Sequence, residues 1–366
     1  MRLVIDARLY GLEHRGLGRY LVELIRVLSE IDHQTDYILL VNPSNKTQPD
    51  NLPSNFKQVA APWRVYSFHE QWRLPWLLLK LKPDLVHWPH FTVPLLCPAP
   101  FIVTIHDLIL HSFPSERATT LPKPLYWLKV CLYHLVVARA VRRARQIITV
   151  SQAVANEIRH FYKLKGGKIT VIPLAPGTLA QPVELALPAN YLLVVGAAYP
   201  HKNLDRLTQA FAYVSQLLPE LKFIIVGKKD IFMERLQKLV EQLKLSQAVK
   251  FWGEASEAEL ASLYQRATVY ALPSLAEGFG LGALEALARD TVVLAADIPV
   301  LHEVLAQAAL YANPYDTREL SHQLHRLITD LNLRQELKTA AAQILKSYSW
   351  QSAGTATKQV YSQAAH

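Results

Sequence analysis

Two glutamates, Glu277 and Glu285, stand eight positions apart and enclose three glycines, Gly278, Gly280 and Gly282. A carboxylate only accepts hydrogen bonds, so it suits the hydroxyl groups of a sugar. Backbone amides at the start of a helix are free donors with partial positive charge, and they suit a phosphate. A nucleoside diphosphate sugar presents both kinds of group, so we expect such a ligand here. The alternative, a capped core helix with one solvated glutamate, leaves the glycines unexplained because glycine disfavours helices.

A second glycine-rich turn lies near the start of the chain, where Gly16 and Gly18 follow Gly11 and precede a helical pattern. Closely spaced glycines let the backbone approach a phosphate or a sugar. The turn is not a P-loop, because no Gly-Lys-Ser/Thr follows, and Leu21 replaces the third glycine of a dinucleotide-binding fingerprint. The pattern fits a ligand-binding loop and an ordinary strand-to-helix turn equally well.

Short β-branched runs alternate along the chain with longer stretches of helical period, such as residues 18–29 and 125–144. This alternation predicts parallel βαβ units. We therefore expect an α/β fold of two doubly wound, Rossmann-like domains facing a cleft, with ligands beyond the carboxyl ends of the strands. The predicted strands are residues 3–5, 37–41, 85–88, 101–105, 147–150, 168–172, 191–195, 222–226, 249–252, 268–272 and 292–295.

A proline-rich, weakly periodic segment, residues 172–190, separates the two series of strands and reads as a linker. The predicted domains are therefore residues 1–175 and residues 176–345. Residues 346–366 are expected to hold a final helix.

Composition and charge narrow the class of protein. Hydrophobic residues make up 51% of the chain and charged residues 19%, which excludes a disordered or fibrous protein. Residues 1–175 hold 22 Lys and Arg against 12 Asp and Glu, so they carry the whole excess of the +9 net charge and indicate an anionic partner. Two cysteines without a pair motif, and Asp6 within the first apolar run in place of a signal peptide, favour a cytoplasmic protein.

The spacing of Glu277 and Glu285 resembles the Glu-x7-Glu motif of retaining glycosyltransferases of family four, which have the two-domain GT-B fold. By that resemblance, the final helix within residues 346–366 is expected to return to the N-terminal domain, and a helix confined to the second domain is the alternative. Residues 195–204 (VGAAYPHKNL) look like the donor-phosphate segment of that family, and residues 225–228 (IVGK) like the strand and basic residue that follow. Residues 252–254 (WGE) resemble the turn that receives the nucleobase in that family. In the first half of the chain, residues 69–75 (HEQWRLP) and 104–108 (TIHDL) resemble segments common among its mannosyltransferase-like members, and residues 148–151 (ITVS) match another segment.

The resemblance implies roles for particular residues. Lys202 and Lys228 would neutralise the donor diphosphate as the glycosidic bond breaks, and Glu285 would hold the ribose hydroxyls. Glu277 would hold the transferred sugar, and His106 would face the sugar ring near the acceptor, although a core histidine at a strand end is the alternative. The expected catalytic residues are His106 and Glu277, and the expected donor-binding residues are Gly16, Gly18, Lys202, Lys228, Gly253, Glu277, Gly278, Phe279, Gly280, Leu281 and Glu285.

The chain departs from the family pattern at two positions. Ala197 stands where many members have an arginine, and His201 stands where a second basic residue is frequent. Fewer cations therefore surround the expected diphosphate site than in many members of the family.

The sequence contains no Asp-x-Asp and no His/Cys cluster with zinc-ligand spacing. We therefore expect a metal-independent enzyme without a cofactor, in which lysines and helix amides take the role of a divalent cation. By resemblance it would be a retaining transferase that moves a hexose, mannose from GDP-mannose first and glucose from UDP-glucose second, onto a glycan or lipid-linked acceptor.

Two further readings remain open at this stage. A nucleotide-sugar epimerase has the same fold and would consume donor without an acceptor. A two-domain sugar-binding protein would have no reason to carry Glu277, Lys202 and His106 at one cleft. Nucleic-acid binding is disfavoured because no reader motif accompanies the basic residues.

Residues 123–145 carry six basic residues and no acidic ones, among leucines and aromatic residues. Such a helix can lie on an anionic membrane surface, and we expect peripheral contact with the inner face of the membrane. The alternative is a buried core helix with a solvated basic end. The cluster Trp63, Trp72, Trp76 and Trp88 is expected to pack in the core, and a platform for a sugar is the alternative.

Overall fold

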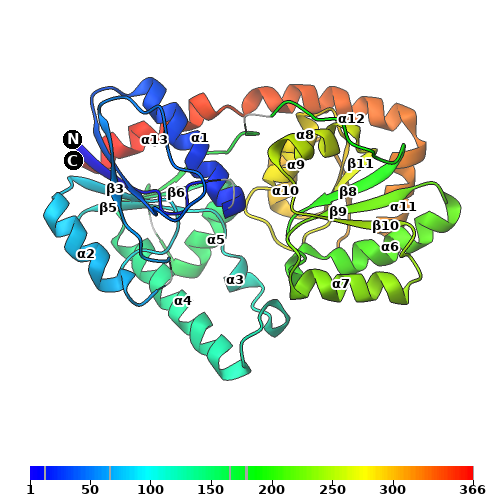
Figure 1. The fold of residues 1–366 in the computed structure, drawn as a ribbon, viewed down its shortest axis with the longest axis horizontal. Coiled ribbons are helices and arrows are strands. Elements are labelled where there is room, and N and C mark those ends of the chain that lie inside the picture. Colours follow the sequence, from blue (N-terminus) through cyan, green and yellow to red (C-terminus); the bar gives the residue numbers. More distant parts are fainter. Residues whose placement is uncertain (12–13, 66, 165, 178–179, 366) are drawn as a thin grey trace. The chain divides into compact units, whose positions relative to one another are not determined.

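The computed structural model describes residues 1–11, 14–65, 67–164, 166–177 and 180–365. It divides the chain into two compact units. Unit 1 consists of Met1–His111, Leu121–Ala175 and Ser349–His366, and unit 2 of Ser112–Thr120 and Pro176–Tyr348. In each unit, helices cover both faces of one sheet (Figure 1).

Unit 1 is built on a seven-stranded sheet in the order β3-β2-β1-β4-β5-β6-β7, in which every pair is parallel. The carboxyl ends of parallel strands meet at one edge. The order of the strands reverses between β1 and β4, and ligands bind at such a switch point. The strands are β1 (Arg2–Asp6), β2 (Asp36–Val41), β3 (Phe56–Ala60), β4 (Leu85–Trp88), β5 (Phe101–Ile105), β6 (Gln146–Thr149) and β7 (Ile169–Val171).

The helices of unit 1 form a layer on each face of this sheet. One apolar cluster joins the strands to Leu74 and Leu78 of α2, Val137 and Ala140 of α4, and Ile158 of α5. Helices α1 and α13 lie together on the other face (Figure 1). The helices are α1 (Arg15–Ile31), α2 (Glu70–Leu81), α3 (Ile109–Ser112), α4 (Lys123–Arg143), α5 (Gln152–Tyr162) and α13 (Trp350–Ala365).

Unit 2 repeats the design with a six-stranded parallel sheet in the order β10-β9-β8-β11-β12-β13. Its switch point lies between β8 and β11. Its strands are β8 (Tyr191–Val195), β9 (Lys222–Val226), β10 (Val249–Gly253), β11 (Val269–Leu272), β12 (Val293–Ala296) and β13 (Ala309–Ala312). Its helices are α6 (Leu204–Leu217), α7 (Ile231–Gln242), α8 (Glu257–Arg266), α9 (Leu281–Leu287), α10 (Pro299–Leu305), α11 (Thr317–Thr329) and α12 (Leu331–Ile344), with short 3-10 turns at Glu116–Ala118, Pro200–Lys202 and Leu345–Ser347.

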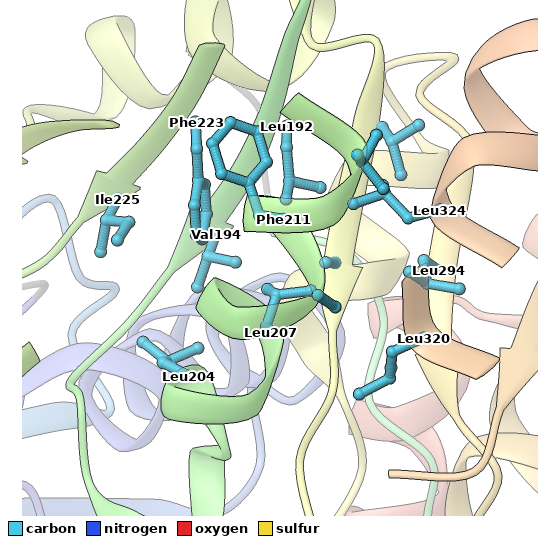
Figure 2. Close-up of a cluster of buried hydrophobic side chains, with 14 of the residues drawn as sticks. Leu192, Val194, Leu204, Leu207, Phe211, Phe223, Ile225, Leu294, Leu320 and Leu324 are labelled. Carbon is cyan, nitrogen blue, oxygen red and sulfur yellow. The ribbon is translucent and has the colours of Figure 1, made fainter. Parts of the chain in front are cut away.

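The core of unit 2 is built around the buried side of α6. Leu204, Leu207 and Phe211 recur at helical spacing on α6 and are 4% exposed or less. Figure 2 shows them between strand residues such as Leu192 and the α11 residue Leu324. Apolar residues three to four positions apart form the buried stripe that an amphipathic helix needs.

The prediction of two doubly wound domains is confirmed, and each predicted strand is present within one or two residues of its predicted bounds. Two further strands escaped prediction. Strand β3 contains Lys57 and Gln58 and is largely exposed at the edge of its sheet. In strand β13, two of the four residues are alanine, which has low strand propensity.

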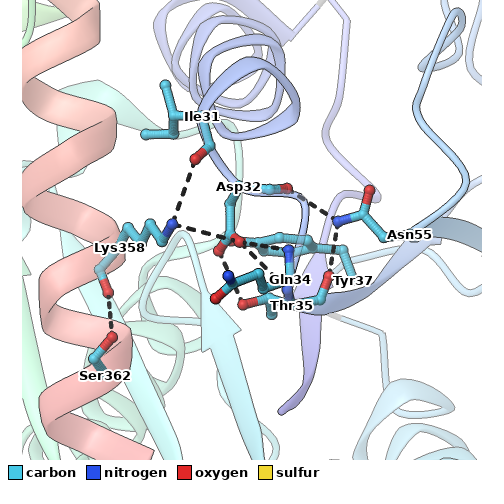
Figure 3. Close-up of polar contacts among 8 residues, drawn as sticks. All are labelled: Ile31, Asp32, Gln34, Thr35, Tyr37, Asn55, Lys358 and Ser362. Atoms are coloured by element: carbon cyan, nitrogen blue, oxygen red, sulfur yellow. Dashed lines mark hydrogen bonds and ion pairs between the residues drawn. The ribbon is translucent and has the colours of Figure 1, made fainter.

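Helix α13 joins unit 1 through close contact with α1. Gly354 lies so near α1 that a Cβ atom there would stand 2.4 Å from Val27 Cγ1. At the end of α1, Lys358 Nζ lies 3.5 Å from the carboxylate of Asp32 and donates to Ile31 O (Figure 3). The last helix therefore completes unit 1 although unit 2 precedes it in the chain.

The carboxylate of Asp32 is itself held by three neighbours. Burial alone would raise its pKa, but donors from Gln34 N, the Thr35 hydroxyl and the Tyr37 hydroxyl outweigh burial and lower it (Figure 3). Asp32 is therefore a fixed negative charge at the point where α13 reaches α1.

A buried polar network also ties α13 to the sheet. His87 of β4 makes hydrogen bonds of 2.8 Å to the Tyr361 hydroxyl and to Thr104 Oγ1 on β5. Tyr20 of α1 shares the Thr104 hydroxyl at 3.2 Å. Burial first, and His106 second, lower the pKa of His87 to about 3, so this imidazole is neutral at physiological pH.

Removing one hydroxyl from this network tests its contribution. We expect Tyr361→Phe to lower the free energy of unfolding by about 1 to 3 kcal/mol, because a buried nitrogen of His87 loses its partner. Urea unfolding measures the change. The matched control is Tyr213→Phe, at an exposed position on α6, where a change within about 0.5 kcal/mol is expected. Equal effects at the two positions would contradict the assigned role.

Candidate active site

The residues singled out in unit 2 lie at the carboxyl edge of its sheet. The loop after β8 and the loop after β11 meet there, because these strands are neighbours. Leu275 N donates to His201 O at 2.7 Å, and Asn203 Nδ2 donates to Pro273 O at 3.0 Å. These hydrogen bonds fix the two loops against each other at the switch point of the sheet.

The structure brings Lys202 and Glu277 into direct contact. Lys202 Nζ lies 2.6 Å from Glu277 Oε1, and the Ser274 hydroxyl donates to the same oxygen at 2.7 Å. The Glu277 side chain is 9% exposed and that of Lys202 is 27% exposed. A partly buried cation and carboxylate therefore share the edge where a charged ligand would be received.

His201 lies beside this pair and does not add a positive charge. Burial is the largest cause that lowers its pKa to about 4, the adjacent Lys202 lowers it further, and Glu277 opposes both. The imidazole is neutral at pH 7. His201 thus does not replace the positive charge of the basic residue that is frequent at its position, and Lys202 carries the positive charge of this loop.

Glu285 lies in the second turn of α9, and its side chain is largely buried. It is 8% exposed, and the Tyr264 hydroxyl donates to its Oε2 at 3.2 Å. Helix α9 follows Gly280, whose φ of +86° is the left-handed conformation that favours glycine. A Cβ atom at Gly280 would stand 2.7 Å from Leu301 Cδ2, so the start of α9 sits tightly on its neighbours.

The other predicted donor residues of unit 2 line the same carboxyl edge. Gly253 is the last residue of β10, and its carbonyl accepts from Gly227 N at 2.9 Å. Lys228 follows Gly227 beyond β9 and is exposed. Phe279 is buried and packs edge-on against Tyr348 at 5.8 Å. Gly278 is buried, and Leu281, half-buried, begins α9.

In unit 1 the predicted residues follow β1 and β5. A Cβ atom at Gly18 would stand 1.8 Å from Gly11 O, so the turn allows only glycine there, whereas Gly16 is exposed with open space around it. His106 packs edge-on against Tyr20, with ring centroids 4.7 Å apart. Leu12 and Glu13 of this turn lie outside the described residues.

The tautomer of His106 follows from its contact. Its Nε2 lies 3.0 Å from Pro89 O, and since a carbonyl only accepts, Nε2 carries the proton and Nδ1 is left as an acceptor. Burial lowers the pKa of His106 to about 4, against the raising effect of this hydrogen bond. His106 is therefore a neutral group able to accept one hydrogen bond.

Sequence reasoning missed a buried charge cluster at the end of β1. Arg8 is 1% exposed, and its guanidinium pairs with Asp6 at 2.7 Å and with Glu70 at 2.9 Å. Arg8 also donates to Trp63 O. An acidic residue inside the apolar run of β1 was the available signal, because a buried carboxylate requires a partner.

No group of three His, Cys, Asp or Glu side chains within the described part of the chain is arranged to hold a metal ion. The polar groups at the edge of unit 2 are the carboxylates of Glu277 and Glu285, the ammonium groups of Lys202 and Lys228, the Ser274 hydroxyl and backbone amides. This chemistry matches hydroxyl-rich and phosphate-bearing ligands better than a metal ion.

Comparison with known proteins identifies the class and the family. Both units have solved structural neighbours among two-domain GT-B glycosyltransferases. Residues 14–175 match the family described as Glycosyltransferase Family 4, and residues 179–344 match Glycosyl transferases group 1. The chain therefore belongs to the family-four glycosyltransferases.

Curated relatives span nearly the whole chain. The O-antigen chain mannosyltransferase RfbU of Salmonella typhimurium is 29% identical over 86% of this chain and 88% of its own length. The O-antigen chain mannosyltransferase B of Escherichia coli is 26% identical over 94% of this chain and 95% of its own length.

Solved structures share the fold at lower identity. Sucrose-phosphate synthase from Thermosynechococcus elongatus superposes with a TM-score of 0.79 at 19% identity, covering 99% of this chain and 98% of that one. The Anabaena protein HepE, solved in complex with UDP and glucose, gives a TM-score of 0.73 at 16% identity and 99% coverage of both chains. At this identity the likeness shows the fold alone.

The protonation state of His106 can be tested directly. We expect its imidazole signals to keep the neutral Nε2–H form from neutral pH down to about pH 5, since burial holds its pKa at about 4. NMR titration of the ring resonances measures this, and the variant His106→Gln assigns the signal by its disappearance. A titration midpoint near 6.5 would contradict the buried, carbonyl-bound geometry.

Proposed function

We propose that the chain transfers a hexose with retention of configuration, mannose from GDP-mannose, onto a glycan or a lipid-linked acceptor. The observation that carries the proposal is the contact of Lys202 with Glu277 at the switch point of unit 2. The printed names of the two curated relatives, both O-antigen chain mannosyltransferases, support mannose as the sugar.

The chemistry assigned to the pair follows from its charges. A breaking glycosidic bond leaves negative charge on the diphosphate, and the ammonium group of Lys202 would stabilise that charge as it develops. The carboxylate of Glu277 would accept hydrogen bonds from hydroxyls of the transferred sugar. Lys202 would then exchange part of its contact with Glu277 for the phosphate. Lys228, exposed one strand away, would add a second cation.

In unit 1, His106 would accept a hydrogen bond through Nδ1 from a hydroxyl of the sugar or the acceptor. A neutral imidazole suits this role because it places no extra cation beside the sugar. The roles of Gly16, Gly18 and Gly253 remain predictions, as do the cytoplasmic location and the absence of nucleic-acid binding. Contact with an anionic membrane is a separate proposal, which does not depend on the donor.

A second donor, UDP-glucose, is kept because the structural neighbour HepE was solved with UDP and glucose. Both donors present a diphosphate and a hexose, so the Lys202 and Glu277 contact fits either. Only the nucleobase and the sugar configuration distinguish them. The epimerase alternative is separated by its chemistry, since it would consume donor at full rate with no acceptor present.

Thermal unfolding with added nucleotides tests the donor. We expect GDP and GDP-mannose to raise the Tm by several degrees at a hundredfold excess over Kd, because binding to the folded state adds about 2.7 kcal/mol. UDP and ADP should give smaller shifts. No response to any nucleotide would refute the assignment, whereas a larger response to UDP would change the donor only.

A variant of Glu285 sharpens this test. Glu285→Gln keeps a side chain of the same shape beside Tyr264 but removes the charge, so we expect nucleotide affinity to fall about tenfold or more. The control is Glu220→Gln, at an exposed position after α6. His106→Ala should leave nucleotide binding intact and reduce turnover. The reverse pattern would mean that the two roles are exchanged.

Two assays of the enzymatic reaction test metal independence and retention of configuration. We expect donor consumption to continue in EDTA, because lysine and amide groups would stabilise the leaving diphosphate. Loss of activity in EDTA with recovery on adding manganese would contradict this. The one-bond C1–H1 coupling constant of the transferred sugar, measured by NMR of the product, should show the anomeric configuration of the donor. A product of the opposite anomeric configuration would refute retention.

A further inference from the structure

Unit 1 exposes large apolar side chains on two helices that cover the same face of its sheet. On α2, Trp72, Trp76 and Leu79 recur at spacings of four and three residues, and each is more than half exposed. Residues at this spacing share one side of a helix. The expectation that Trp72 and Trp76 pack in the core is therefore wrong. Their neighbours Leu74 and Leu78 form the buried side instead.

Helix α4 carries a longer stripe of the same kind. Leu125, Leu128, Leu132 and Leu135 repeat at spacings of three and four residues, and each is more than half exposed. The α4 side chains in the core of the sheet, such as Val137, come from its last third. The alternative of a buried core helix therefore holds only for that last third and for the inner side of α4. Its first two thirds present leucines to the solvent.

One loop links the two stripes into a single surface. Leu95 N donates to the Gln71 side chain of α2 at 3.0 Å, and Arg139 of α4 donates to Leu95 O. Leu96, next in this loop, is 70% exposed. We call the set the Trp–Leu surface; it consists of Trp72, Trp76, Leu79, Leu96, Leu125, Leu128, Leu132 and Leu135. Exposed apolar side chains grouped in this way mark an interaction site.

The exposed charges on α2 and α4 all have one sign. Helix α4 contains five basic residues and no acidic one. On α2, Lys80 Nζ lies 3.7 Å above the Trp76 ring and the Arg73 guanidinium 5.2 Å from the Trp72 ring. The one acidic residue of α2, Glu70, is 2% exposed and paired with Arg8. The surface is therefore apolar and cationic, with no exposed negative charge on either helix.

Charge decides between the two occupants that an apolar surface could take. A second copy of this chain, related by a two-fold axis, would bring the same cations together, and like charges repel. An anionic bilayer supplies acyl chains for the leucines, a polar interface for the tryptophans, and negative headgroups for the lysines and arginines, whose aliphatic stems can lie along the apolar surface. Among the described residues, no helix is long and apolar enough to cross a membrane.

We propose that the Trp–Leu surface docks unit 1 on an anionic lipid bilayer, with α2 and α4 lying in the interface. This goes beyond an isolated basic helix, because α2 and the Leu96 loop take part. Docking does not depend on the identity of the donor or the acceptor, so its test uses no turnover. A failure of the glycosyltransferase proposal would leave it standing, and its own failure would leave the transferase proposal intact.

Flotation with vesicles tests the proposal on the full chain. We expect the protein to float with vesicles of phosphatidylcholine containing about a third phosphatidylglycerol, and to bind pure phosphatidylcholine at least about tenfold more weakly, since several cations near such a surface are each attracted to the negative headgroups. Binding should weaken as salt is raised, because salt screens the charges. Equal binding to both vesicles, or none to either, would overturn the proposal.

Matched variants separate this surface from general stickiness. The triple variant Trp76→Ser, Leu128→Ser, Leu132→Ser changes exposed residues only, and we expect it to lose at least about tenfold in vesicle affinity. The control variant, Tyr213→Ser, Leu217→Ser, Leu331→Ser, removes equally exposed apolar side chains from unit 2 and should bind as the unchanged protein does. Equal binding by both variants would refute the assigned surface.

A third variant tests the role of charge alone, and a second measurement tests whether a second copy of the chain occupies the surface. Lys80→Gln with Lys129→Gln keeps the apolar residues and should weaken binding to the anionic vesicles alone, which tests the charge even if the serine variant folds poorly. Sedimentation velocity tests the competing occupant. A dimer that forms with concentration and disappears in the serine variant, in a protein that ignores vesicles, would assign the surface to a second copy of the chain and overturn the bilayer.

Discussion

The parallel pairing of every strand in both sheets is the constraint on which the rest of the structure depends. Parallel strands place all their carboxyl ends at one edge, and the reversal of strand order in the middle makes neighbouring loops leave in opposite directions. In unit 2 the neighbouring strands β8 and β11 start these two loops side by side. Lys202 of one loop and Glu277 of the other therefore meet, although they are 75 positions apart in the sequence. The contact between these side chains is thus a consequence of topology before it is one of charge.

Burial determines the charge states at both edges. His87, His106 and His201 all have pKa values far below the ordinary value of a histidine, because each loses water on folding, so none contributes a cation at neutral pH. Arg8 keeps its charge because Asp6 and Glu70 surround it in the interior. The cations that remain available at the edge of unit 2 are lysines, which are compact point charges suited to a mobile phosphate.

The features that the sequence predicted depend on local patterns of residues. The features that it did not predict depend on contacts between residues far apart in the chain. Regular alternation of apolar runs predicted both sheets, and the spacing of Glu277 and Glu285 placed one in a loop and the other on a helix. The burial of Glu285 under Tyr264 could not be predicted, because the two lie on different helices. The tryptophans of α2 were expected in the core because tryptophan commonly packs there, whereas the helical phase that turns Trp72 and Trp76 outward is fixed by Leu74 and Leu78 against the sheet.

The position of α13 has a consequence for the order in which the protein is made. Because α13 packs on α1 through Gly354 and reaches His87 through Tyr361, the first unit contains the last helix of the chain. During synthesis the strands of unit 1 leave the ribosome early, yet the face that α13 covers stays open until translation has passed all of unit 2. Unit 1 is therefore begun first and completed last. The face of its sheet that α13 covers stays exposed while unit 2 is synthesised.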